Sequence, residues 1–288
     1  MSTQILICFI SGLLWACFDL TRKLSLNHVS PKIFLLLFMF IQMFFFLIWC
    51  IYDSFYFYFD LYLIPGFFSA ITGILGGLIF LKSLKESHIS LTIPLLSVTP
   101  LFSSIFSWVF LDEELSSIEY LGILAIIFGI LILYSDTFRL KSIFNSFLNI
   151  KNNLSAKLMI LVAFLWSLVP VFDKMCLDHS SINIHGLVQS ILIFIILLFF
   201  SLKDIKDLTT LKKSNYKLIF LTTLIGISAV VMQFISISIT FVPIMEAIKR
   251  ATGQFGALIF GKIFFNEGIT EQKVSGIIII SAGVFMLI

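Results

Sequence analysis

The segment Val242–Glu267, VPIMEAIKRATGQFGALIFGKIFFNE, combines a membrane-like composition with a cluster of charged residues. Glu246, Lys249 and Arg250 all lie within its first nine residues. An ionised side chain inside hydrocarbon costs roughly 2.5–3.5 kcal/mol, so such residues usually face a wet cavity or a partner. The spacings of three and four place all three on one helix face. They predict either a substrate site or a self-neutralised pair that reaches the membrane surface, and charge at membrane depth favours the site.

The composition of the whole chain indicates a polytopic membrane protein. Its 288 residues are 59% hydrophobic and 12% charged, with a mean hydropathy of +1.10. A soluble domain of this composition would expose large apolar patches. The basic residues are scattered, so no nucleic-acid partner is expected. The four cysteines lack CxxC spacing and the four histidines lack metal spacing, so we expect no metal and no cofactor.

The hydrophobic segments predict an all-α membrane protein. A membrane-spanning helix needs about 20 predominantly apolar residues. Ten segments approach this length, and the fourth and ninth contain Pro or Gly, which packed membrane helices tolerate. The ten expected helices are Gln4–Leu20, Ile33–Ile51, Ile64–Leu81, Leu91–Leu111, Ser117–Tyr134, Leu158–Met175, Ile184–Leu202, Lys217–Ile239, Val242–Phe265 and Ile269–Ile288.

The placement of Lys and Arg predicts the orientation. Sixteen of the 19 basic residues fall in connections on one side of the ten-helix scheme, and the positive-inside rule makes that side cytoplasmic, with both termini outside. These sixteen are Arg22, Lys23, Lys32, Lys82, Lys85, Arg139, Lys141, Lys151, Lys157, Lys203, Lys206, Lys212, Lys213, Lys217, Lys262 and Lys273.

The chain repeats itself. Leu14-Trp15 recurs as Leu165-Trp166 at an offset of 151, and later matches, such as Glu113 with Glu267, have an offset of 154. We therefore expect two repeats, residues 1–150 and 151–288, with five helices each. An odd number of helices inverts the second repeat relative to the first. Inverted repeats with a site between them are typical of transporters.

Several stretches resemble one family, the EamA-type transporters of the drug/metabolite transporter superfamily. They are the Leu-Trp of each half, FLDEELSSIEYLG at 110–122 and VPIMEAIKRATGQFGALIFGKIFFNEGIT at 242–270. The resemblance implies a ten-helix secondary transporter, not an enzyme, for small organic solutes that are often amino acids and often exported. Many relatives carry an Arg in the second helix, whereas here Gln42 is the polar residue of FLLLFMFIQMFFF at 34–46, with Gln189 as its counterpart.

The candidate binding residues lie at membrane depth. The two tryptophans can wall a cavity or simply pack in the core, and Gln233 can bind a substrate or join two helices. The expected substrate-binding residues are Trp15, Trp166, Gln233, Glu246, Lys249 and Arg250. Three further residues are candidates for coupling or gating, namely Asp19, Gln42 and Gln189.

Other charged residues are expected at the ends of helices. Asp19 and Lys23 are four apart and can pair. Asp173 is expected to face water at the end of the sixth helix. Glu113 and Glu267 precede the last helix of each half and suit turns at the membrane surface.

The charges of the 242–267 segment suggest the substrate. Two cations and one acid leave a net positive charge, which favours a carboxylate or phosphate, and Glu246 can hold an amine. We expect a multi-pass protein of the bacterial inner membrane that moves an amino acid or related zwitterion or anion by alternating access, with export as the direction. Its partners would be the small-molecule substrate, the bilayer and a coupling proton or exchanged solute, and it would be a monomer or dimer. Alternatives are transport of neutral solutes such as nucleosides, or a non-transporting sensor or scaffold.

The orientation can be tested by cysteine labelling. In a background without the native cysteines, an impermeant reagent applied outside intact cells should miss cysteines placed in Ser135–Lys157 and Lys203–Tyr216, because both connections are predicted to be cytoplasmic. Strong labelling of either connection would contradict the predicted orientation but not the prediction of ten helices.

Overall fold

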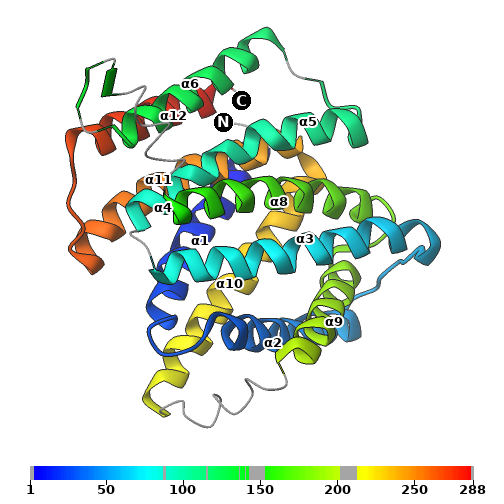
Figure 1. Cartoon of the computed structure of the whole chain (residues 1–288). Helices are drawn as coiled ribbons and strands as arrows, with labels where there is room; N and C mark the ends of the chain where they lie inside the picture. The colour runs from blue at the N-terminus through cyan, green and yellow to red at the C-terminus, as the bar shows by residue number, and fades with distance from the viewer. Residues whose placement is uncertain are drawn as a thin grey trace.

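The computed structural model describes residues 3–86, 89–114, 116–135, 137–139, 141–142, 153–201 and 213–286. Over these residues the chain forms ten apolar helical segments (Figure 1). The fourth is built from α4, a 3-10 turn and α5 in succession. The bounds are α1 Thr3–Ser25, α2 Pro31–Tyr52, α3 Phe59–Glu86, α4 Ile89–Leu95, the 3-10 turn Leu96–Val98, α5 Thr99–Leu111, α6 Ser117–Leu133, α8 Leu154–Leu177, α9 Ile182–Ser201, α10 Lys213–Ile239, α11 Val242–Phe265 and α12 Glu271–Phe285.

Seven of these segments are long and apolar enough to cross a membrane. The remaining three are α6 and α12, which have 17 and 15 residues, and α11, which is long enough but carries the charged cluster. The fourth segment is interrupted where Pro94 and Pro100 each remove a backbone donor from the helix. This all-helical arrangement agrees with the fold class expected from the sequence.

The contact between α6 and α12 shows the duplication and its inversion. A Cβ atom on Gly283 would lie 2.6 Å from the carbonyl oxygen of Gly122, and one on Gly276 would lie 2.8 Å from that of Gly129. At the offset of 154, Gly122 corresponds to Gly276 and Gly129 corresponds to Gly283. Gly122 therefore contacts the counterpart of Gly129, and Gly129 contacts the counterpart of Gly122. The two matching helices are therefore antiparallel, and the second half is inverted relative to the first.

The other helices exchange partners in the same two-fold manner. Helix α3 packs on α8, and α10, the counterpart of α3, packs on α1, the counterpart of α8. In the same way α11 packs on α1, and α5 packs on α8. Helix α2 contacts its counterpart α9, and α6 contacts its counterpart α12. These two pairs lie on opposite sides of the central helices (Figure 1). This arrangement surrounds the centre of the molecule with helices from both halves.

Two buried glutamates tie each half to the other. Helices α5 and α11 both end in a left-handed residue, Asp112 with φ 55° and Asn266 with φ 52°. The next amide then bonds back six residues, from Glu113 to Ser107 and from Glu267 to Gly261. This turn points both glutamates inward. Both glutamates lie in the turns expected before the last helix of each half, but with exposed fractions of 6% and 3% their side chains are buried in the protein.

The first of these contacts involves Glu113 of the first half. Its Oε1 accepts a hydrogen bond from Nζ of Lys174 at 2.8 Å, and its Oε2 accepts one from the backbone amide of Val242 at 3.1 Å. Lys174 also donates to the carbonyl oxygen of Thr240 at 2.9 Å. One carboxylate therefore holds the end of α8 and the start of α11, both in the second half. We call this set the Glu113 latch.

The second contact is its counterpart around Glu267. Oε1 of Glu267 accepts a hydrogen bond from the backbone amide of Ile89, at the start of α4, at 2.8 Å. Lys23, the counterpart of Lys174, lies within the electrostatic reach of Glu267 and donates to the carbonyl oxygen of Leu84 at 3.0 Å. We call this set the Glu267 latch. Because α5 and α11 run in opposite directions, the two latches lie at opposite ends of the molecule.

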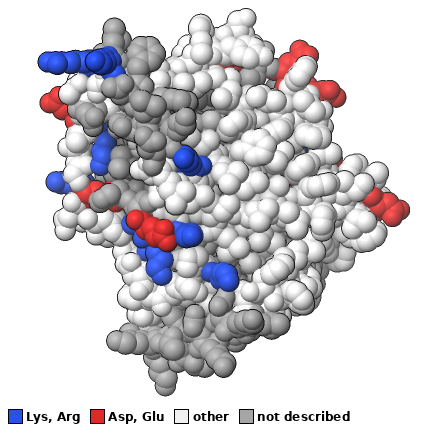
Figure 2. All heavy atoms as spheres, viewed as in Figure 1, with Lys and Arg blue, Asp and Glu red and all other residues white. Residues whose placement is uncertain are grey.

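The surface matches a membrane protein. On the face in Figure 2, a broad band of uncharged side chains separates the charged groups; Lys and Arg gather toward the left of the view, whereas the right edge shows acidic groups. This distribution agrees with the predicted charge asymmetry. Most of the two long connections, Ser135–Lys157 and Lys203–Tyr216, and the expected repeat boundary at 150/151 lie outside the described residues.

The glycine contact between α6 and α12 predicts a sensitive position. In Gly283→Ala the new methyl group would lie 2.6 Å from a backbone oxygen and 2.9 Å from the backbone nitrogen of Ile126, so the helices must separate. Such overpacking typically costs about 1–3 kcal/mol, and the thermal unfolding midpoint of the purified protein should fall. Gly73→Ala is the control, because no atom lies within 4 Å of its new Cβ. An equal fall in both variants would contradict this packing.

Candidate functional site

A cavity of about 180 Å³ lies at the centre of the molecule. Side chains from α1 to α4 and from α8 to α11 line it, so both halves contribute equivalent helices. This volume is smaller than the roughly 300–1,000 Å³ of pockets for drug-sized ligands, so it suits a small organic solute. Eight of the nine residues that the sequence suggested line this cavity, namely Trp15, Asp19, Gln42, Trp166, Gln189, Gln233, Lys249 and Arg250.

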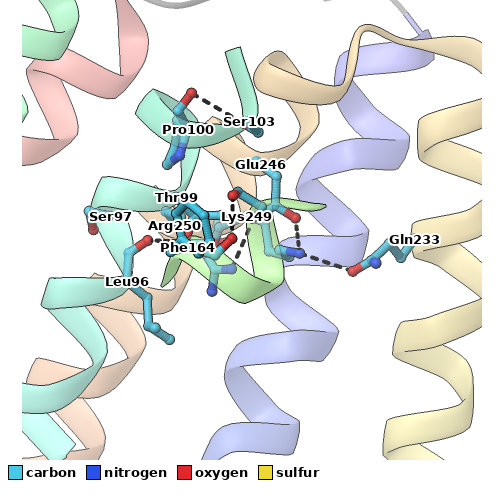
Figure 3. Close-up of polar contacts among 12 residues, drawn as sticks. Leu96, Ser97, Thr99, Pro100, Ser103, Phe164, Gln233, Glu246, Lys249 and Arg250 are labelled. Atoms are coloured by element: carbon cyan, nitrogen blue, oxygen red, sulfur yellow. Dashed lines mark hydrogen bonds and ion pairs between the residues drawn. The ribbon is translucent and has the colours of Figure 1, made fainter. Parts of the chain in front are cut away.

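The ninth residue, Glu246, lies behind the cavity wall and holds the two cations of α11. Its side chain is 0% exposed. Oε1 is bonded to Lys249, and Oε2 accepts a hydrogen bond from Nη2 of Arg250 at 3.0 Å (Figure 3). Both carboxylate oxygens are therefore occupied. Removing one member of a buried ion pair typically costs about 3–5 kcal/mol, so Glu246 is what makes the two cations tolerable at this depth.

Lys249 faces the cavity between α10 and α1. Its Nζ donates a hydrogen bond to Oε1 of Gln233 at 3.0 Å, which Figure 3 shows reaching across from α10. The same Nζ lies 5.4 Å from the ring centroid of Trp15, within the range of a cation–π contact. Gln233 and Trp15 therefore position Lys249, and both predicted residues join one group of contacts.

Arg22 is a third cation in the cavity and was not among the residues expected from the sequence. The first helix was expected to end at Leu20, which placed Arg22 in a cytoplasmic connection. Helix α1 instead continues to Ser25, and Arg22 is 5% exposed. Its guanidinium carbon lies 4.0–5.8 Å from the centroids of four aromatic rings, namely Trp15, Phe18, Phe80 and Trp166. Both predicted tryptophans therefore enclose a cation.

The acid that balances Arg22 is Asp19. The two side chains form a buried ion pair three residues apart. The expected pairing of Asp19 with Lys23 was wrong, because Lys23 points away toward Leu84. The spacing of three between Asp19 and Arg22 was the signal that the sequence offered. It was overlooked because the apolar segment ends at Leu20, so Arg22 was not assigned to the helix.

Asp173 brings an acidic group to the α8 side of the cavity. It was expected to face water, yet it is 4% exposed and lines the cavity. Ser69 donates a hydrogen bond to its Oδ1, and Nε2 of His185 lies 3.5 Å from the same oxygen. Asp173 is the counterpart of Arg22 at the offset of 151. Two charged residues at matching positions of duplicated helices were the signal that could have identified both.

Several polar atoms around the cavity have no hydrogen-bond partner among the described groups. Nε2 of Gln42 donates to Oγ of Ser190 at 2.9 Å and Nε2 of Gln189 to the carbonyl of Gly66 at 2.9 Å, yet their Oε1 atoms remain unpaired. Buried polar atoms without partners are rare and call for an explanation. Five of these unpaired atoms belong to residues that line the cavity, namely Trp15 Nε1, Arg22 Nε, Gln42 Oε1, Gln189 Oε1 and Arg250 Nε.

Among the described residues, no group of three or more His, Cys, Asp or Glu side chains is arranged to hold a metal ion. The described site therefore offers charged and hydrogen-bonding side chains, with aromatic walls, as its chemical means of recognition.

The chain is similar to known transporters. The model of the EamA-like transporter family matches residues 2–135 and 153–288. A protein of Archaeoglobus fulgidus that is described as an uncharacterized transporter is 26% identical over 219 residues, which cover 74% of this chain and 71% of that protein.

A crystal structure of a protein described without a function has the same fold. It superposes with a TM-score of 0.65 at 15% identity, over 99% of this chain and 96% of its own. At this identity the likeness concerns the fold alone.

The family match covers both halves and nearly all of the ten-helix scaffold around the cavity. Family members are transporters and not enzymes, so a small-molecule substrate and a multi-pass position in a membrane follow. This chain belongs to the EamA-like transporter family.

Proposed function

We propose that the protein is a secondary transporter for an amino acid or a related zwitterion or anion, and that it works by alternating access. The observation that carries this proposal is the pair Lys249 and Arg250. Both line the central cavity, and buried Glu246 holds both in place. A substrate carboxylate, or a phosphate, would bind cations that are already oriented and desolvated.

The charges are arranged to suit a zwitterion. Two cations of the cavity come from α11, whereas Asp173 lies on α8. Glu246 is occupied by Lys249 and Arg250, so it is poorly placed to hold an amine. Asp173 has no Lys or Arg among its described ion-pair contacts and is the better partner for a substrate ammonium group. An amino acid would then bridge the two groups.

The two latches support alternating access. They join the halves at opposite ends of the cavity through equivalent residues. Opening one end requires that Glu113 release Lys174 and the start of α11, and opening the other requires that Glu267 release the start of α4. Equivalent contacts of this kind allow one end to stay closed while the other opens, which is how inverted repeats expose a site alternately.

The cellular setting belongs to the same proposal. We place the protein in the bacterial inner membrane, as a monomer or dimer, with export of the substrate as its direction. A proton or an exchanged solute would supply the driving force. Transport of a neutral solute such as a nucleoside is the competing function, and a non-transporting sensor is a second one.

The cation pair gives a direct test of function. Lys249→Ala and Arg250→Ala should each abolish uptake of amino acids into proteoliposomes, because each loses a cation that contacts the substrate carboxylate. Gln233→Ala should weaken uptake less, since it only positions Lys249. The assay is a screen of radiolabelled amino acids, organic acids and nucleosides.

Lys262→Ala is the matched control, because Lys262 is an exposed residue of the same helix. Unchanged affinity and rate in both cation variants would disprove the site. Uptake of nucleosides alone would support the neutral-solute alternative, and no uptake of any compound would favour the sensor.

The latches predict opposite conformational shifts. Glu113→Gln should open the cavity at the end where Glu113 lies, and Glu267→Gln should open the other end, because each loses the charge that attracts a lysine. A cysteine at Gly73, which lines the cavity, would report this through labelling by an impermeant maleimide applied on the Glu113 side. Glu113→Gln should raise labelling and Glu267→Gln should lower it.

The control for the latches is Glu114→Gln, because Glu114 is the exposed neighbour of Glu113. Alternating access through these contacts would be contradicted if both latch variants changed the labelling in the same direction, or if Glu114→Gln had the same effect as Glu113→Gln.

A further inference from the structure

A chain of three buried polar side chains leads from the cavity to one end of the molecule. Asp173 lies in the last turns of α8, and His185 and Tyr62 lie in the first turns of α9 and α3. Nε2 of His185 is 3.5 Å from Oδ1 of Asp173, and Nδ1 of His185 is 2.9 Å from the Tyr62 hydroxyl. Tyr62 adjoins the loop where the amide of Tyr58 donates to the carbonyl of His179 at 3.0 Å.

Asp173 differs from three other buried acids in the kind of partner it has. Asp19 pairs with Arg22, Glu246 with Lys249 and Arg250, and Glu113 with Lys174. These lysine and arginine partners keep their charge at neutral pH. The described ion-pair contact of Asp173 is instead a histidine, the side chain that ordinarily changes its charge between pH 5 and 8.

The surroundings of the pair contain few other titratable groups. From α3 it faces Tyr62 and the hydroxyl of Ser69, and from α8 it faces Cys176, which interacts electrostatically with both Tyr62 and Asp173. From α10 the ring of Phe234 packs on His185 with centroids 4.6 Å apart. The charged groups that share the cavity are Asp19, Arg22, Lys249 and Arg250, and they are engaged in the ion pairs described above.

The geometry of His185 favours a shared proton. The ring is 0% exposed, and its Nε2 has no hydrogen-bond partner within the described part of the chain, although it faces Asp173. When Nδ1 accepts from the Tyr62 hydroxyl, the proton of the neutral ring lies on Nε2, toward the carboxylate. A second proton on the ring, or one on Asp173, converts the pair from net negative to neutral. This geometry allows the two residues to share one proton.

We propose that Asp173 and His185 form a proton-binding site, and that a proton on this pair is exchanged for the ammonium group of the substrate. The second part rests on the proposed function. An ammonium group that binds Asp173 brings the same positive charge as the proton, so the two compete for one carboxylate. Each substrate that binds then releases a proton, and transport of the two in opposite directions follows.

The proton site itself can be tested without a substrate. The purified protein, with ¹⁵N-labelled histidine, is titrated from pH 5 to pH 8 and the ring nitrogens are followed by nuclear magnetic resonance, with His185→Gln to assign the signal. We expect the pair to take up one proton during this titration. In Asp173→Asn, which keeps an oxygen for Ser69, that uptake should be lost because the carboxylate that shares the proton is gone.

Asp178→Asn is the matched control, since Asp178 is an exposed carboxylate at the end of the same helix. It should leave the protonation step of His185 unchanged. A His185 ring that stays neutral from pH 5 to pH 8 in the wild-type protein would overturn the proton site, whatever the substrate proves to be.

The exchange is tested by proton release. A panel of L-amino acids is added to the protein in weakly buffered detergent solution, and a pH-indicator dye records the change. Linkage requires about one proton released for each amino acid bound when the two compete fully. The corresponding acids without the amine carry the same carboxylate and should release none. Asp173→Asn should bind the amino acids more weakly and release no proton, whereas His179→Gln should behave as wild type.

The outcomes separate the two proposals. Amino acids that bind or are transported without proton release in the wild-type protein would overturn the exchange and leave the proposed function intact. Proton release that persists in both Asp173→Asn and His185→Gln would place the coupling elsewhere and overturn the site. If no amino acid binds, the proposed function fails and the exchange with it, while the titration of His185 still decides whether the pair binds a proton.

Discussion

Charge at membrane depth is the constraint on which this structure depends. Moving an ionised group into a low-dielectric interior costs several kcal/mol even after the protein relaxes. In the described residues the cost is met by local pairing, with Glu246 between two cations and Asp19 beside Arg22. Aromatic rings then surround Arg22 and contact Lys249. The cavity can present cations to a solute because these acids lie within the same helices.

The ten helices, their inverted duplication and eight of the residues that line the cavity could be predicted from the sequence. Hydrophobic length located the helices, and the offsets of 151 and 154 located the matching halves. The charges of α11 pointed to the cavity because their spacing is local to one helix. The structure brought Trp15 and Gln233 to Lys249 as well, although the sequence showed only that both residues lay at membrane depth.

The missed residues were those whose role depends on contacts between distant helices. Arg22 looked like a loop residue because the apolar segment ends before it. Charged residues follow that segment, so the sequence does not show where the helix itself ends. Asp173 looked solvated because Ser69 and His185 come from other helices. Glu113 and Glu267 suited surface turns, and the left-handed residue before each of them turned their side chains inward. No spacing along the chain could have shown the partners of Asp173, Glu113 and Glu267, whereas the spacing of three between Asp19 and Arg22 is visible in the sequence.

The reciprocal glycine contacts of α6 and α12 have the form of an isologous interface, the kind that joins identical subunits about a two-fold axis. In a dimer of identical chains, every position on one side of that axis carries the same residue on the other. Arg22 and Asp173 occupy matching positions with opposite charges. A chain that holds both halves can differ in this way, so the polarity of the cavity is a property that a symmetric homodimer of one half cannot possess.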